Sequence, residues 1–262
     1  MRTYNVEMTI LAHHAVLLVL LACAIFLSAV WSPSPAVFTL LFFALPAAYI
    51  IYVRPHVWVP ALSAALLFGL LYGVSFDYIV EISGEWIFPR ASEFYAPNIF
   101  LGVVSGDVLL WFFLWVFLVV AYHEAFIDRR NRVARQSALR LGAALLLGII
   151  PLVSILIFRS ALVVPYSYAI LGLCALVPVA VLFMRNKYPM KKLWYSTPYF
   201  VLLFLCMELV ALGYGYWDFT GEYIGSVLVL GRVLPVEEII LWIIGSPIIL
   251  VAYHELFLDD ER

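Results

Sequence analysis

Long apolar stretches alternate with short polar connections along almost the whole chain. Eight of these stretches are long enough, at about 17 to 25 residues each, to cross roughly 30 Å of hydrocarbon as helices. The expected spans are 10–30, 36–53, 58–80, 103–126, 139–158, 161–184, 194–215 and 234–257. The first stretch lacks a small-residue cleavage pattern, so we expect it to remain in the mature chain. The pattern predicts an all-α, polytopic membrane protein.

The second half of the chain repeats features of the first half at a spacing of 131 residues. The sequence Tyr122-His123-Glu124, for example, reappears as Tyr253-His254-Glu255. We therefore predict two repeats of four helices each, at residues 1–131 and 132–262. An even number of helices per repeat makes the repeats parallel and relates them by an axis along the membrane normal, which disfavours a transporter built on inverted repeats.

Composition and charge place the chain in the membrane and indicate its orientation. Hydrophobic residues make up 66% of the 262 and charged residues 12%, and the mean hydropathy is +1.05. Basic residues favour the cytoplasmic side, and a cytoplasmic N-terminus leaves only Arg90, Arg159 and Arg232 of the 15 outside. We expect an integral protein of a bacterial cytoplasmic membrane with both termini cytoplasmic. The net charge of -2 argues against a nucleic-acid partner.

Each half contains an acid that is followed nine residues later by a tryptophan. Asp77 precedes Trp86 in the first half, and Glu208 precedes Trp217 in the second, with Gly two residues before and Phe two residues after each tryptophan. Glu208 lies inside a predicted span, where an ionised carboxylate is costly. Since few basic residues are within reach, we expect some of these acids to be neutral at pH 7, which suits a proton donor.

The last span opens with Glu237 and Glu238, directly after Pro235-Val236. One interpretation is an N-terminal pattern, because Pro and acidic residues suit the first turn of a helix. The other is a chemical site, because Asp107 occupies the position of Glu238 in the first half. The second interpretation predicts four acids that face one another around the repeat axis: Asp77, Asp107, Glu208 and Glu238.

Aromatic residues accompany these acids. Trp111 and Trp242 follow Asp107 and Glu238 by four residues, so each ring is expected one turn below its carboxylate on the same helix face. Such rings can stabilise a carbocation, or they can serve only as packing residues. Substrate contact and an interfacial aromatic belt are the two interpretations for the aromatic residues nearer the membrane surface, which are Trp86, Trp217 and Phe219.

The repeated His-Glu pairs are predicted at the opposite membrane boundary. His254 follows Glu238 by sixteen residues, which is about 24 Å along a helix. A metal site is conceivable, but the chain has no His-x-x-His or Glu-x-x-His pattern. We expect these residues to bond helix ends and to hold no metal.

The order of acid, Trp-x-Phe, Gly and Pro-x-Glu-Glu in tandem membrane repeats resembles the integral-membrane lycopene cyclase family, which comprises heterodimeric bacterial cyclases and fused single-chain relatives. The matching residues are Asp77, Trp86 and Phe88 in the first half, and Trp217, Phe219, Gly231, Pro235, Glu237 and Glu238 in the second. The first half has Asp107 after Val104-Ser105-Gly106 in place of Pro-x-Glu-Glu, and Leu241-Trp242 replaces two Phe. These departures predict that one of two potential sites is inactive or altered.

The resemblance implies a cofactor-independent lycopene or carotenoid cyclase with a lipophilic carotenoid substrate. In this reaction an acid protonates the terminal double bond, the neighbouring double bond captures the cation to close a six-membered ring, and a carboxylate removes a proton. The sequence contains no nucleotide fingerprint. The roles assigned are Glu238 as acid or base, Glu237 as its partner, Glu208 as the second ionisable group, Trp217 and Trp242 as cation stabilisers, and Asp77 and Asp107 as pseudo-symmetric counterparts.

Two other functions remain open at this point. A carotenoid hydratase would protonate the same bond and let water capture the cation. A non-catalytic protein that binds a carotenoid or organises other carotenoid enzymes in the bilayer is the second alternative, and it predicts that the acids point to separate faces or to solvent.

Overall fold

The computed structural model describes residues 2–89, 98–128, 138–185 and 190–258. Within these residues it is an all-α bundle with eight helical spans long and apolar enough to cross a membrane, as predicted. The spans are Ile10–Trp31, Pro35–Val53, Pro55–Ile82, Gly106–Asp128, Ala138–Leu162, Ser167–Met184, Thr197–Tyr214 and Glu238–Leu258. The sixth span begins six residues later than predicted, because Arg159–Leu162 extends the fifth as a 3-10 turn and Tyr166 adopts a left-handed conformation.

Most spans are composite. The α-helices are α1 (Arg2–Trp31), α2 (Pro35–Thr39), α3 (Leu45–Val53), α4 (Trp58–Ala64), α5 (Gly73–Ile82), α6 (Gly106–Tyr122), α7 (Ala138–Phe158), α8 (Ser167–Ala175), α9 (Val177–Arg185), α10 (Met190–Tyr195), α11 (Thr197–Tyr214) and α12 (Gly245–Tyr253). Wider π-helical turns cover Leu40–Ala44, Ala65–Tyr72, His123–Asp128, Glu238–Ile244 and His254–Leu258, and a further 3-10 turn covers Pro55–Val57.

Two of the π-helical turns have a local cause in the sequence. Leu40–Ala44 is followed by Pro46, and Glu238–Ile244 is followed by Pro247. Proline has no N–H to donate and its ring crowds the preceding turn, so the helix widens just before it. The second of these turns carries Glu238 and Trp242, and its geometry therefore sets where both side chains point.

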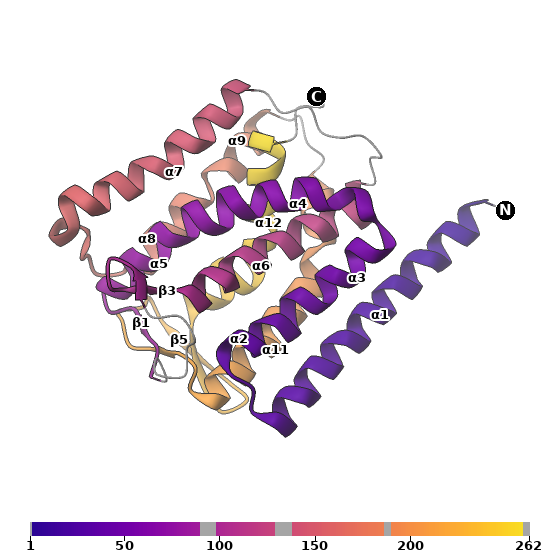
Figure 1. Ribbon diagram of the computed structural model, residues 1–262, viewed down its shortest axis with the longest axis horizontal. Helices are drawn as coiled ribbons and strands as arrows, with labels where there is room; N and C mark the ends of the chain where they lie inside the picture. The colour runs from indigo at the N-terminus through magenta and orange to yellow at the C-terminus, as the bar shows by residue number, and fades with distance from the viewer. Residues whose placement is uncertain (1, 90–97, 129–137, 186–189, 259–262) are drawn as a thin grey trace.

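The centre of the bundle is formed by the fourth and last spans, which are mostly buried. In Figure 1, α6 and α12 run through the middle of the molecule, while α1 and α7 lie at opposite edges. The edge helices expose large apolar side chains along their length, for example Leu146 and Phe26. Such surfaces suit lipid, which indicates that the edge helices face the bilayer.

Short strands gather at one end of the bundle (Figure 1). The strand β1 (Trp86–Ile87) pairs antiparallel with β4 (Asp218–Phe219), so that a strand from each half of the chain contributes to one ribbon. Two hairpins lead into the central spans: β2 (Asn98–Phe100) with β3 (Val104–Ser105) before α6, and β5 (Ser226–Val229) with β6 (Arg232–Pro235) before the last span.

Some sequence-based expectations concern parts of the chain that lie outside the described residues. The boundary expected between the two repeats, at residues 131 and 132, is one of them. The same holds for several basic residues on which the expected orientation depends: Arg90, Arg129, Arg130, Arg132, Arg135, Lys187 and Arg262.

Candidate functional site

A pocket at the strand-covered end of the bundle collects residues from both halves of the chain. Its empty volume is about 650 Å³. It is lined by Pro35, Thr39, Asp77, Trp86, Phe88, Asp107, Val108, Trp111, Phe112, Tyr168, Glu208, Trp217, Phe219, Glu238 and Trp242. Both halves of the chain thus contribute to one pocket, because the central spans place both acid-bearing helix ends on it. That the contribution of one half is inactive or altered stays a prediction.

Four carboxyl groups line this pocket, and they are the four that the repeat predicted to face one another. They come from α5, the start of α6, α11 and the start of the last span, and all four side chains are buried. No lysine, arginine or histidine is among the described residues that line the pocket. Acids in such surroundings are rare and mark functional sites, although their catalytic role remains a prediction.

The acid and tryptophan that lie nine residues apart meet in both halves. In the second half, Trp217 donates a hydrogen bond from Nε1 to Glu208 Oε1 at 2.6 Å. In the first half, the Asp77 carboxyl lies beside the Trp86 indole and the Glu81 carboxyl without reaching hydrogen-bond geometry with either. Glu208 is therefore held by a fixed donor, while Asp77 is positioned by packing.

Glu238 is held by a residue that the sequence did not reveal. The Tyr168 hydroxyl, which is fully buried, donates a hydrogen bond to Glu238 Oε2. The Tyr168 ring stacks on Trp242, with centroids 5.8 Å apart and planes 28° apart. The repeat offered no signal for Tyr168, because the residue 131 positions earlier is Val37.

Glu237 does not line the pocket, so the expectation that it partners Glu238 in the site needs correction. Its Oε1 instead accepts a hydrogen bond from the Ile224 backbone N–H at 2.5 Å. Successive side chains on a helix point about 100° apart, given roughly 3.6 residues per turn, so only one of two adjacent glutamates can face the pocket. Nor does the Glu237 side chain cap the helix. It fixes the loop that precedes β5.

The five aromatic residues predicted at the site all line the pocket, namely Trp86, Trp111, Trp217, Phe219 and Trp242. They belong to a larger cluster of rings, in which Trp242 contacts Phe76 and Trp115 with centroids 4.8 and 4.9 Å apart. Trp86 and Phe219 face each other across β1 and β4. The aromatic residues near the surface therefore close one end of the pocket.

Glu85 joins the loops of the two halves next to the pocket. Its Oε1 accepts hydrogen bonds from Ser167 N at 2.8 Å and from Ser167 Oγ at 3.2 Å, at the start of α8. Its backbone carbonyl accepts from Gly221 N at 3.0 Å and from the Tyr223 hydroxyl. Burial raises the pKa of the Glu85 carboxyl, and the Ser167 hydrogen bonds oppose this shift. Glu85 thereby fixes the backbone next to Tyr168.

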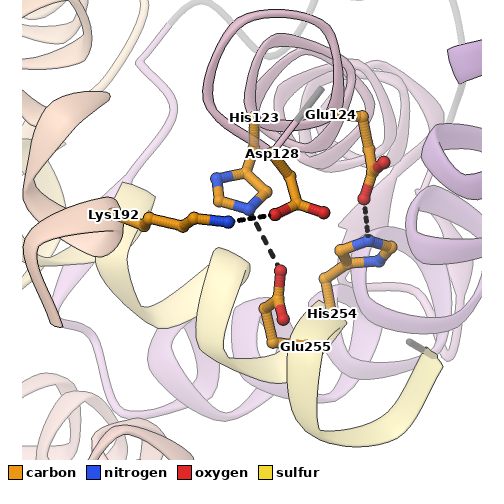
Figure 2. A network of polar contacts seen from close by, with 6 residues as sticks. All are labelled: His123, Glu124, Asp128, Lys192, His254 and Glu255. Carbon is orange, nitrogen blue, oxygen red and sulfur yellow. Dashed lines mark hydrogen bonds and ion pairs between the residues drawn. The ribbon is translucent and has the colours of Figure 1, made fainter. Parts of the chain in front are cut away.

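The repeated His-Glu pairs bond each other at the opposite end of the bundle. His123 Nε2 lies 3.1 Å from Glu255 Oε1, and His254 Nε2 lies 2.7 Å from Glu124 Oε1. Figure 2 shows these two pairs side by side, together with the ion pair of Lys192 and Asp128. Each histidine of one half is thus bonded to the glutamate of the other, and the two central spans are connected reciprocally.

Comparison of the chain with protein-family models, curated proteins and solved structures finds no match. The chemistry of the pocket therefore has to be inferred from its geometry. An apolar, aromatic-walled pocket with several carboxyl groups and no basic lining residue can give a proton to a hydrophobic molecule, stabilise a cation on it, and take a proton back.

Proposed function

We propose that this chain is a membrane-embedded isomerase that closes a ring at the end of a linear carotenoid such as lycopene, by proton transfer and without a cofactor. The observation that carries the proposal is the gathering of Asp77, Asp107, Glu208 and Glu238 on one aromatic-walled pocket. This arrangement disfavours a non-catalytic scaffold, for which the acids would point to separate faces or to solvent.

The polarity of the pocket supports a hydrocarbon end group as the ligand. Small-molecule sites are mostly apolar with a few polar groups, and this pocket is lined mainly by aromatic and aliphatic side chains with four carboxyl groups among them. Such a lining suits one end of a carotenoid, while the rest of the long polyene would extend beyond it. The lipophilic substrate would reach the pocket from the bilayer.

The proposed reaction balances without an oxidant or a reductant. A carboxylic acid gives its proton to the terminal carbon–carbon double bond, which leaves a cation on the end group. The electron pair of the neighbouring double bond attacks this cation and closes a six-membered ring. A carboxylate then removes a proton from a carbon of the new ring and restores a double bond. One proton enters and one leaves, so substrate and product are isomers.

Glu238 and Glu208 are the pair that we propose for proton transfer. Each is held by one donor, Glu238 by the Tyr168 hydroxyl and Glu208 by the Trp217 indole. A fixed carboxyl meets the substrate carbon without reorganisation, which is the main source of electrostatic catalysis. Trp217 and Trp242 line the same pocket, and we propose that their rings stabilise the cation. Asp77 and Asp107 would complete the acidic surface on the other side.

The distribution of charge supports a cytoplasmic membrane with the pocket at the non-cytoplasmic end. More basic residues lie at the end of the bundle remote from the pocket, namely Arg54, Arg140, Arg185 and Lys192, and Lys192 pairs with Asp128 there. Arg159 and Arg232 lie at the pocket end. By the preference of basic residues for the cytoplasm, both termini would be cytoplasmic. Such a protein would be embedded among other carotenoid enzymes of the same membrane.

Production of the chain in a lycopene-accumulating bacterial host tests the proposed function. We expect a cyclic carotene of the same mass as lycopene, identified by chromatography with mass spectrometry of the pigment extract. Unchanged lycopene in cells whose membranes contain the protein at normal amounts contradicts the proposal. A product heavier by one water molecule identifies a hydratase instead, since both reactions begin with the same protonation.

Replacing Tyr168 with Phe is expected to lower kcat while KM changes little. The substitution keeps the stacked ring but removes the hydrogen bond to Glu238. A hydrogen bond to a charged group contributes about 1.5 to 3 kcal/mol, which corresponds to roughly a 10- to 160-fold loss of rate. The rate of cyclisation in isolated membranes, followed across a pH series, measures the effect. The pH optimum of the rate should shift because the Glu238 carboxyl loses the hydrogen bond from the Tyr168 hydroxyl.

Tyr223→Phe is the matched control for this substitution. The Tyr223 hydroxyl donates to the Glu85 carbonyl, and Tyr223 does not line the pocket. Loss of the Tyr223 hydroxyl should leave the pH dependence of the cyclisation rate unchanged. If the two variants behave alike, Tyr168 does not position Glu238 for proton transfer.

A further inference from the structure

The hairpin formed by β5 and β6 exposes apolar side chains although it lies outside the membrane spans. It connects the seventh span, which ends at Tyr214, to the last span, which begins at Glu238. Leu228 is 71% exposed and Leu230 at the tip is 88% exposed, and Ile224 and Val233 are also mostly exposed. Loops in water rarely carry such a concentration of large apolar side chains, and exposed patches of this kind mark interaction surfaces.

Both faces of the hairpin carry these side chains. Val227 and Leu228 are neighbours on β5, and both are exposed. Neighbouring residues on a strand point to opposite faces. A protein partner that docked on one face would leave the other face in water. A surrounding medium of lipid would cover both faces and the tip together.

The turn of the hairpin is strained at a leucine. Val229 pairs with Arg232, so Leu230 and Gly231 form a two-residue turn, with φ of +46° and +81°. Turns with positive φ at both positions strongly favour Asn-Gly or Asp-Gly, and a bulky residue at positive φ is an outlier. A leucine thus occupies a position at which the backbone conformation favours a small polar residue.

The hairpin of the first half, β2–β3, also has a leucine with a positive φ at its tip. Leu101 and Gly102 have φ of +49° and +74°, and Leu101 is exposed. Strained residues often indicate a function that outweighs the strain. Both tips lie at the same end of the bundle and next to membrane spans. A leucine at each tip fits contact with lipid better than contact with water.

We propose that the β5–β6 hairpin is an interfacial anchor, with its tip and both faces immersed in the headgroup and upper acyl region of the bilayer. Its two strands pair only with each other among the described residues, so their outer backbone groups need water, which excludes deep insertion. The interface provides apolar contact and water together. Arg232 can extend its guanidinium toward lipid phosphates.

Anchoring at this point would also hold the pocket in place, whatever reaction the pocket performs. The strand β6 ends at Pro235, three residues before Glu238. Val236 N donates to Gly225 O at 2.9 Å, and Ile224 N donates to Glu237 Oε1, so the base of the hairpin is bonded to the start of the last span. These hydrogen bonds connect the hairpin directly to the acid-bearing end of the helix.

Quenching in vesicles tests the anchor. The full chain, with Cys23, Cys174 and Cys206 replaced by Ser, is labelled at Leu230→Cys with a polarity-sensitive fluorophore. It is reconstituted into vesicles of phosphatidylcholine and phosphatidylglycerol. Glu222→Cys, an exposed position in the same connection, is the matched control. We expect the ratio of quenching by nitroxide-bearing lipid to quenching by aqueous iodide to be at least about threefold higher at 230 than at 222.

A substitution that suits the turn separates lipid contact from folding. With the fluorophore at Val227→Cys, Leu230→Asn should lower lipid quenching at least about twofold without lowering the unfolding temperature in detergent, because asparagine suits this turn. Iodide quenching at 230 equal to that at 222 overturns the proposal. Protection at 230 from both quenchers also overturns it, since it indicates a protein partner.

Discussion

Glu238→Gln is expected to abolish ring closure in membranes while the protein accumulates at wild-type amounts. Glutamine has the shape of glutamate and can still accept the hydrogen bond from Tyr168, but it cannot give or take a proton at the pH of the cell. Loss of a positioned acid or base lowers rates by about 10²- to 10⁴-fold. Cyclic and linear pigments, quantified per amount of membrane-bound protein, measure the loss.

The adjacent glutamate provides a sharp control. Glu237 is buried like Glu238, but its carboxyl bonds the Ile224 backbone outside the pocket. Glu237→Gln retains an acceptor for that bond and should keep most of the activity. Cyclisation that survives Glu238→Gln, or that is lost equally in both variants, removes Glu238 from the proposed mechanism.

Glu255→Ala is expected to lower the free energy of unfolding by about 1 to 3 kcal/mol, which is typical when one partner of a buried hydrogen bond is removed. Glu255 and His123 are both buried, and they connect the two central spans. The alanine leaves the imidazole without this carboxylate in surroundings that solvate it poorly. Denaturant unfolding in detergent micelles, monitored by tryptophan fluorescence, measures the change.

Exchange of His123 and Glu255 tests whether the contact between them is responsible for the stabilisation. The double variant His123→Glu with Glu255→His restores an imidazole and a carboxylate across the same interface. We expect it to be more stable than either single exchange. Glu222→Ala, at an exposed position, should change stability by less than about 0.5 kcal/mol. A double exchange no more stable than the singles would show that the helices pack without help from these pairs.

The spans and the acidic pocket could be predicted because their signals are local or periodic. Hydropathy follows from runs of adjacent residues, so eight spans were found with ends close to the observed ones. The depth of an acid follows from its distance to a span end, and the spacing of 131 residues placed Asp107 and Glu238 at the same depth. Both now line one pocket.

The features that could not be predicted depend on contacts between segments far apart in the sequence. Tyr168 reaches Glu238 across 70 positions, and no repeated residue pointed to it. The pairing of β1 with β4 is equally remote, because two-residue strands leave no periodic pattern to read. Glu237 was assigned wrongly to the pocket because the orientation of the first helical turn is set by the loop that bonds it. That bond is invisible in a motif of adjacent acids.

The pairing of β1 with β4 has a consequence for how a substrate with two like ends is processed. Trp86 of β1 and Phe219 of β4, one from each half of the chain, pair with each other and line the same pocket, so among the described residues both halves contribute to one pocket. The two halves contribute differently, since Tyr168 donates a hydrogen bond to Glu238 and the residue 131 positions earlier is Val37, which has no hydroxyl. Under the proposed function, the ends of a symmetric polyene would be closed in succession. Under that proposal the molecule would have to withdraw, turn end over end in the bilayer and insert again.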